Sequence, residues 1–259
     1  MPGSLHVIAA EPDAVSPGGG AEIRHILTSP LGDLTHAVCP AGHVAPTHYL
    51  PDLDEAYFVL AGVGEIWRAT EEREAVTTLR PGRWVQMPAN SRFQFRAGRG
   101  TSLVFLVVVL PSWAPDLFHT VPDGRWTTGT HDQAPPTPEA DLVDGWMSGD
   151  LPVEFDDLAS EKIEVRRLGW FDRGSLAHCA LPAGASSTPG CDSTAHQIWY
   201  VTEGCGELRR AGNGEETTDL LWPGIGFDIP ADITFQLRAT GMGPLGAVRL
   251  RMPHPASAA

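Results

Sequence analysis

A histidine and a glutamate lie seven residues apart in the segment THYLPDLDE, residues 47–55, just before the apolar run AYFVLAG. These two side-chain types exchange protons, or bind metal ions, when they are held close together. If the apolar run is a β-strand, alternation places Tyr57 on the same face as Glu55. The candidate catalytic residues are therefore His48, Glu55 and Tyr57, and His48 and Glu55 are also the candidate metal ligands.

An internal repeat with an offset of 142 residues tells how these residues are positioned. DLTHAVCPAG at 33–42 corresponds to SLAHCALPAG at 175–184, and AYFVLAGVGEIWR at 56–68 corresponds to IWYVTEGCGELRR at 198–210. PGRWVQMPANSRFQFRA at 81–97 likewise corresponds to PGIGFDIPADITFQLRA, which starts at residue 223. Because one offset fits all three pairs, the chain is read as a duplicated domain.

Each copy consists of short runs rich in Val, Leu, Ile, Phe and Trp, separated by turns that contain Gly and Pro. Such a pattern predicts antiparallel strands in a sandwich or barrel. Gly62 and Gly204, at equivalent positions, can adopt the positive φ that hairpin turns require. The predicted fold class is all-β and duplicated.

The first copy resembles the cupin family, whose pattern is G-x5-H-x-H-x3-4-E-x6-G followed by G-x5-P-x-G-x2-H-x3-N. It has Gly42, His48, Glu55 and Gly62 at these spacings, and a later glycine and proline also fit. The resemblance implies a bicupin, with two double-stranded β-helix (jelly-roll) barrels. The boundaries that we predict are 1–111 for the N-terminal barrel, 112–160 for a connector and 161–259 for the C-terminal barrel.

In cupins three histidines and a glutamate bind one metal ion, and this ligand set is incomplete here. Leu50 and Phe93 stand where two of the imidazoles are expected. The second copy has none of the histidines, and its corresponding residues are Gly190, Asp192, Gln197 and Phe235. The resemblance thus implies degenerate metal motifs, and the alternative is a divalent ion (Fe, Mn, Ni or Zn) bound weakly by His48 and Glu55 with His36 as third ligand.

The substrate-binding residues are predicted from strand alternation around Glu55 and Gln197. In the first copy they are His36, Phe93 and Phe95, and in the second copy they are Asp192, Gln197 and Trp199. His36 recurs as His178, but its neighbours are apolar on both sides, so the pattern allows either the barrel interior or the outer face. Phe93 either contacts a substrate or fills the space of a missing ligand.

Composition and charge exclude several partners. The formal charge of −14 and the single lysine, Lys162, disfavour nucleic acid and anionic membranes, which need clustered cations. No run of 18 apolar residues and no basic leader segment is present, which favours a cytoplasmic protein. Four cysteines without a CxxC pair are read as reduced thiols. The expected partner is a small-molecule substrate, and a homodimer is left open.

Three functions fit these residues. The first is an isomerase, lyase or cyclase that uses His48 and Glu55 as acid and base in the N-terminal barrel. The second is a mononuclear non-haem metal oxygenase with an altered ligand set. The third is a bicupin that binds a small ligand, or acts as a scaffold, without catalysis.

Overall fold

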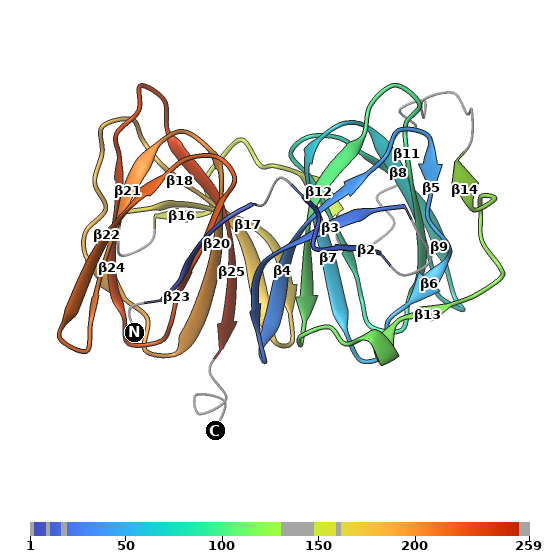
Figure 1. Ribbon diagram of the computed structural model, residues 1–259, viewed down its shortest axis with the longest axis horizontal. Coiled ribbons are helices and arrows are strands. Elements are labelled where there is room, and N and C mark those ends of the chain that lie inside the picture. The colour runs from blue at the N-terminus through green and yellow to red at the C-terminus, as the bar shows by residue number, and fades with distance from the viewer. Residues whose placement is uncertain (1–2, 9–10, 17–19, 131–147, 159–161, 254–259) are drawn as a thin grey trace. The chain divides into compact units, whose positions relative to one another are not determined.

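The computed structural model describes residues 3–8, 11–16, 20–130, 148–158 and 162–253. It consists of two compact units, residues 9–150 and residues 1–8 together with 151–259. We call them the N-terminal barrel and the C-terminal barrel. Each is built from antiparallel β-sheets (Figure 1), and the one helix in the described part of the chain is a short 3-10 turn, η1 (Pro115–Leu117). The predicted all-β, duplicated jelly-roll class is confirmed.

One sheet of the N-terminal barrel has seven strands and carries the glutamate of the candidate site. Its order is β15 (Ser148–Asp150), β10 (Arg83–Met87), β7 (Asp54–Ala61), β12 (Leu103–Leu110), β4 (Gly32–Cys39), β3 (Glu22–Ser29) and β2 (Ala14–Val15). Glu55 lies on β7, in the middle of this sheet, where both neighbouring strands fix its direction.

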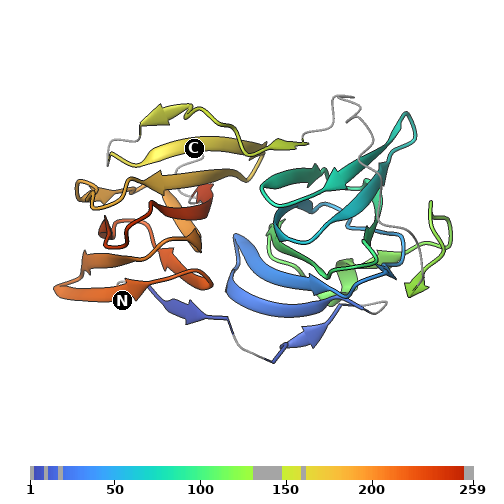
Figure 2. The ribbon, with the colours of Figure 1, turned by 90° about the horizontal axis from the view of Figure 1, so that it is seen from above.

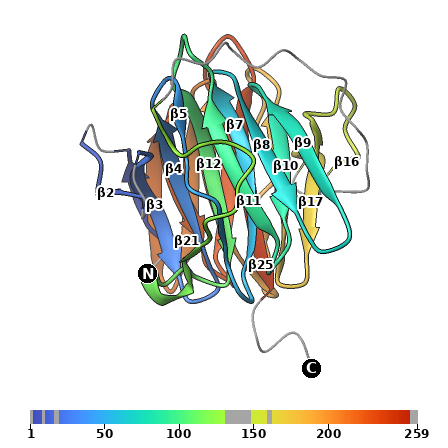
Figure 3. The same ribbon diagram turned by 90° about the vertical axis from the view of Figure 1, so that its right-hand side faces the viewer.

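The other sheet of this barrel carries the histidine. Its strands are β13 (His119–Thr120), β6 (His48–Tyr49), β11 (Arg92–Ala97), β5 (His43–Val44), β14 (Gly129–Thr130), β8 (Gly64–Ala69) and β9 (Glu74–Leu79). Strand β8 pairs with both β11 and β9 (Figure 3). Because His48 pairs with Phe93 on β11, the histidine and the glutamate come from facing sheets.

The C-terminal barrel repeats this arrangement. Its larger sheet has the order β1 (Leu5–Val7), β23 (Ile225–Ile229), β20 (Ala195–Glu203), β25 (Leu245–Pro253), β18 (Gly174–Leu181), β17 (Glu164–Phe171) and β16 (Asp157–Leu158). The smaller sheet contains β19 (Gly190–Cys191), β24 (Thr234–Ala239), β21 (Gly206–Gly212) and β22 (Glu215–Leu221).

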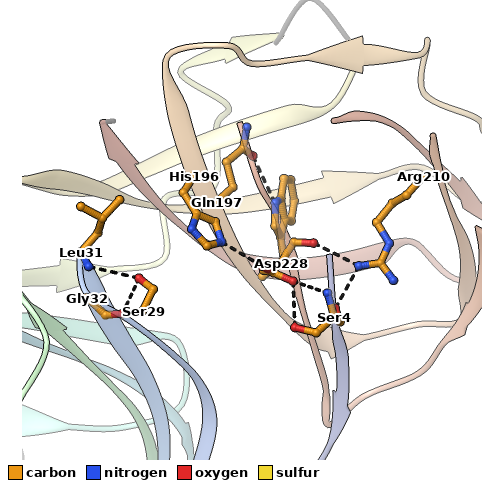
Figure 4. A network of polar contacts seen from close by, with 9 residues as sticks. Ser4, Ser29, Leu31, Gly32, His196, Gln197, Arg210 and Asp228 are labelled. Atoms are coloured by element: carbon orange, nitrogen blue, oxygen red, sulfur yellow. Dashed lines mark hydrogen bonds and ion pairs between the residues drawn. The ribbon is translucent and has the colours of Figure 1, made fainter. Parts of the chain in front are cut away.

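The N-terminal strand β1 pairs with β23 of the C-terminal barrel, although residues 1–111 were assigned to the first barrel from the sequence (Figure 2). Polar contacts hold it there (Figure 4). The Ser4 hydroxyl donates to Asp228 Oδ1 at 2.9 Å, and Arg210 Nη1 donates to the Ser4 carbonyl at 2.9 Å. His196 Nε2 lies 3.0 Å from Asp228 Oδ2. Strand β1 therefore belongs to a sheet whose other strands all come from residues 157–253.

The turn glycines behave as the repeat predicts. Gly62 has a φ of +80°, and a Cβ there would lie 2.0 Å from the carbonyl oxygen of Ser102. Gly204 has a φ of +76°, and a Cβ there would lie 2.0 Å from the carbonyl oxygen of Pro244. Both turns thus require glycine for the same two reasons, the left-handed conformation and the close approach of the backbone.

The interior of each barrel is apolar. Tyr57, Phe95 and Phe105 belong to the core of the N-terminal barrel, and Trp199 and Phe227 belong to the core of the C-terminal barrel. Tyr57 and Trp199 point inward, as the alternation around Glu55 and Gln197 predicts.

The connector divides between the two units, because its described residues up to Asp150 belong to the N-terminal barrel, whereas β16 pairs with β17 of the C-terminal barrel. Trp113 contacts a small apolar cluster with Leu50 and Val109, and Trp126 lies under the guanidinium of Arg96 at 4.6 Å. Residues 131–147 lie outside the described residues. In the described part of the chain, no helix has the length and hydropathy needed to cross a membrane.

Candidate functional site

A cavity of about 140 Å³ lies inside the N-terminal barrel, and the candidate residues line it. Its lining comes from both sheets, including β2 and β3, and from the connector. Its lining includes Ile23, Leu50, Phe95, Phe105, Val107, Val109, Trp113, Phe118, Asp33, His48, Glu55 and Tyr57. An apolar cavity of this size matches the roughly 150 Å³ engineered cavity that binds benzene. It therefore suits a ligand of about the size of one six-membered ring.

Glu55 supplies a carboxyl group to the lining of this cavity. Its side chain is hydrogen-bonded to that of Tyr57, two residues further along β7. Its Oε2 atom is buried and has no hydrogen-bond partner among the described residues. Burial raises the pKa of Glu55 to about 8, and the Tyr57 hydrogen bond opposes this shift. At pH 7 Glu55 is therefore mainly a neutral carboxylic acid that can donate a proton.

His48 lies between two aromatic rings. Phe93 contacts it edge-on with a centroid distance of 4.1 Å, and Phe118 of the connector stacks on it at 4.6 Å. Nδ1 is 2.9 Å from the carbonyl oxygen of Pro46, so Nδ1 carries the proton and Nε2 keeps its lone pair. Burial lowers the pKa of His48 to about 4. His48 is therefore neutral at pH 7.

The two groups form a neutral acid and a neutral base on the wall of one cavity. In the apolar interior the ionised form of each is disfavoured, which moves the two pKa values in opposite directions. Groups of this kind can move protons on a bound molecule without adding net charge to the cavity.

His36 does not belong to this site, so its predicted role in substrate or metal binding is corrected. Asp33, Thr35 and Ala37 of β4 line the cavity, and alternation turns His36 to the opposite face. There it pairs across the sheet with Arg24, as His178 pairs with Arg166 in the second copy. The repeated histidine is thus explained by a repeated arginine neighbour on the outer face.

The two predicted phenylalanines have different positions. Phe95 lines the cavity wall. Phe93 is buried against His48 and Tyr57, with a centroid distance of 6.3 Å to the tyrosine, and is not part of the lining. Phe93 fills the space of the absent imidazole rather than contacting the cavity.

The donor set does not fit a cupin metal centre. Leu50 and Phe93, both buried, present carbon atoms where two imidazoles would bind the ion. Within the described ranges, no three His, Cys, Asp or Glu side chains are grouped closely enough to hold a metal ion. Protein metal sites of this type use three or four donors, and His48 and Glu55 supply two. The chemistry considered below therefore relies on the side chains themselves.

The corresponding part of the C-terminal barrel is filled. Trp199 is completely buried and stacks on Phe227 with a centroid distance of 5.8 Å, which leaves an internal cavity of only about 10 Å³. Trp199 is therefore a core residue, whereas it was predicted to bind substrate. Gln197 accepts a hydrogen bond from Trp199 Nε1 at 3.1 Å, and Asp192 is bound by Arg251 Nε at 2.7 Å. Gln197 and Asp192 line a separate pocket at the barrel mouth.

Sequence reasoning missed several residues of the two sites. Phe118 comes from the connector, which has no repeat counterpart to indicate its position. Val107 and Val109 follow the last segment of the quoted repeat, as do Arg249 and Arg251 in the second copy. Extending the offset of 142 residues by one more strand aligns these two pairs and would have identified them.

The two jelly-roll barrels form the fold of a bicupin, and in both copies the positions that correspond to the cupin metal ligands are only partly occupied by ligand-type side chains. A solved structure of a variant of oxalate decarboxylase from Bacillus subtilis is similar, with a TM-score of 0.74 and 15% identity, over 95% of this chain and 76% of that chain. The same enzyme solved at pH 4.6 is similar with a TM-score of 0.73 and 14% identity, over 95% of this chain and 75% of that one. The sequence matches no family model and no curated protein.

Proposed function

We propose that the N-terminal barrel is an enzyme site for proton transfer on a small, uncharged carbonyl compound, as in isomerisation, elimination or cyclisation. The observation that carries this proposal is the buried carboxyl group of Glu55, whose Oε2 has no hydrogen-bond partner among the described residues, in a largely apolar cavity that His48 also lines. A barrel that needed only stability would have an apolar side chain in place of Glu55.

The proton transfers can be written for a ketone with an acidic α-carbon. His48 Nε2 removes the α-proton while the Glu55 carboxylic acid protonates the carbonyl oxygen, which gives an enol, an imidazolium and a carboxylate. When the ketone is β,γ-unsaturated, the enol is a dienol, and the imidazolium protonates its γ-carbon and so moves the double bond. When the β-carbon carries a leaving group, the imidazolium protonates that group as it departs. The enol hydroxyl returns its proton to Glu55 when the carbonyl forms again. General acid and base groups of this kind contribute roughly 10²–10⁴-fold.

The lining also selects the substrate class. The described residues that line the cavity include no Lys or Arg. A dianion such as oxalate, on which the enzyme of the similar structures acts, would be buried here without a cation, and this carries a large desolvation cost. We infer a neutral substrate of about six to eight non-hydrogen atoms from a cavity of about 140 Å³.

Deuterium exchange in D₂O tests this function without the physiological substrate. Cyclohexanone fits the inferred size, and NMR follows exchange at its α-carbons. We expect the protein to accelerate exchange above buffer and Glu55→Gln to remove most of this acceleration, on the order of 10²-fold. Gln197→Ala, at the matched position of the other barrel, is the control and should retain the activity.

Three results would decide against the proposal. If Glu55→Gln accelerates deuterium exchange as much as the wild type does, Glu55 takes no part in the reaction. If Gln197→Ala loses the acceleration, the active site lies in the C-terminal barrel. Saturable binding of cyclohexanone without any accelerated exchange would favour the non-catalytic binding function.

The expected cytoplasmic location remains a prediction that rests on the sequence alone.

A further inference from the structure

Two arginines occupy the inner face of β25 at the mouth of the C-terminal barrel. Leu245 and Ala247 belong to the barrel core, so alternation directs Arg249 and Arg251 to the same side. They line a pocket of about 310 Å³ together with Asp192, Gln197 and Phe235. This pocket is separate from the cavity of the N-terminal barrel.

The repeat shows how unusual these arginines are. Arg249 pairs across the sheet with Trp199, and Val107 pairs with Tyr57 at the matched place in the N-terminal barrel. Arg251 and Val109 correspond in the same way. The same backbone position therefore accepts an apolar side chain, so the fold itself does not require an arginine there.

The two arginines differ in their contacts. Arg251 is bound to Asp192 Oδ2 and to Thr194 Oγ1, each at 2.7 Å. Arg249 has no hydrogen bond or ion pair with any described residue, and its Nε atom is buried without a partner. Its guanidinium lies 5.5 Å from the ring centroid of Trp199. Arg251 is thus explained by Asp192, whereas the charge of Arg249 is left without a counter-ion.

The charges of the pocket lining leave an excess of one positive charge. Arg249 and Arg251 contribute two positive charges and Asp192 contributes one negative charge. Asp232 acts electrostatically on Cys191 but does not line the pocket. In a chain with a formal charge of −14, a local excess of positive charge favours a bound anion.

We propose that this pocket binds the carboxylate group of a small organic acid, held by Arg249, with Phe235 against the organic part of the ligand. The planar guanidinium group matches a carboxylate with two parallel hydrogen bonds, and the aromatic ring gives the organic part an apolar surface. The proposal concerns the C-terminal barrel and does not depend on catalysis in the N-terminal barrel.

Benzoate titration by calorimetry tests the site, because benzoate combines a carboxylate with an aromatic ring. We expect one benzoate per chain and at least a 10-fold weaker affinity for Arg249→Met, which resembles the tolerated valine of the first copy. Arg238→Met is the control, because the Arg238 side chain is exposed and lies outside the pocket lining. Its affinity for benzoate should equal that of the wild type.

Thermal unfolding separates a lost ligand contact from a lost fold. Benzoate should raise the Tm of the wild type and of Arg238→Met, and should leave that of Arg249→Met unchanged. Absence of benzoate binding to the wild type, or equal binding to Arg249→Met, overturns the proposal. Inorganic phosphate that binds more tightly than benzoate would overturn the assignment to carboxylates.

Discussion

The side chain of Tyr57 is hydrogen-bonded to that of Glu55, two residues away on the inner face of β7. The second barrel repeats this relationship, because Trp199 Nε1 donates to Gln197 Oε1 at 3.1 Å. An aromatic donor thus bonds the residue two positions earlier in both barrels. The acceptor is a carboxyl group in one barrel and an amide in the other, so only the first can exchange a proton near neutral pH.

The stability of the protein should depend on pH through Glu55. Its pKa is about 8 in the folded protein and about 4.5 when exposed. Between these values the unfolded chain loses the proton while the folded protein keeps it, so rising pH favours unfolding. Glu55→Gln lacks this effect. The free energy of unfolding of Glu55→Gln minus that of the wild type should therefore increase by about 1.4 kcal/mol for each pH unit between pH 5 and 8.

Urea unfolding at several pH values measures this difference. Gln197→Glu offers a complementary test, because it introduces a carboxyl group at the matched position, where Asp192 and Arg251 lie nearby. A difference between Glu55→Gln and wild type that does not change with pH would mean that Glu55 is not held in its neutral form.

Removal of the Tyr57 hydroxyl should raise the pKa of Glu55 above about 8, because the hydrogen bond between them lowers that pKa. Tyr57→Phe keeps the ring in the core, and it removes one hydrogen bond worth about 1 kcal/mol. Carbon-13 NMR of labelled glutamate follows the titration directly. Tyr200→Phe, in the C-terminal barrel, should leave the Glu55 titration unchanged, and a downward shift in Tyr57→Phe would contradict the prediction.

The repeat made most of the fold predictable. Short apolar runs with turn glycines at one offset indicated two all-β barrels, and alternation from Glu55 placed Tyr57 and Trp199 in the interior correctly. The histidine at 36 could not be placed, because Leu34 and Val38 on the same face are apolar and a barrel wall has two apolar faces. The face on which His36 lies depends on its pairing with Arg24, which is on the neighbouring strand.

The chemistry of the site was less predictable than its position. The sequence gives residue types, but the pKa of Glu55 depends on how completely other segments cover it. Phe118 and Trp113 belong to the connector, whose path the pattern does not fix. Trp199 was wrongly predicted to bind substrate for a related reason, since alternation shows that it points inward but not that the interior there is filled.

Metal content should be low in the protein as purified without chelators. We expect well under one equivalent of iron, manganese, nickel or zinc per chain, because the described residues include no group of three His, Cys, Asp or Glu side chains close enough to hold a metal ion. Elemental analysis of the wild type measures this, and one tightly held equivalent would contradict it. Leu50→His adds a third donor at a position that lines the same cavity, so this variant should bind zinc or cobalt more tightly than the wild type.

Acid should destabilise the protein through its buried histidines. Burial lowers the pKa values of His36, His48 and His178 to about 4, from an ordinary value of 6.5. Between pH 4 and 6.5 the unfolded chain binds protons at these sites and the folded protein does not, so falling pH favours unfolding. Stability from these groups is complete above pH 6.5. Glu55 has the opposite effect, because it lowers the free energy of unfolding as the pH rises to about 8. The histidines and Glu55 together predict maximal stability near pH 6.5.

The histidine contribution can be separated from that of other groups by substitution. His178→Gln removes one titrating group on the outer face of the C-terminal barrel, and His178 does not line the pocket of that barrel. Its free energy of unfolding should therefore fall less steeply than that of the wild type when the pH is lowered from 6.5 to 4, because one fewer proton is taken up on unfolding. Urea unfolding across this range checks the slope. Identical slopes for the two proteins would show that His178 is protonated in the folded state, in spite of the neighbouring Arg166.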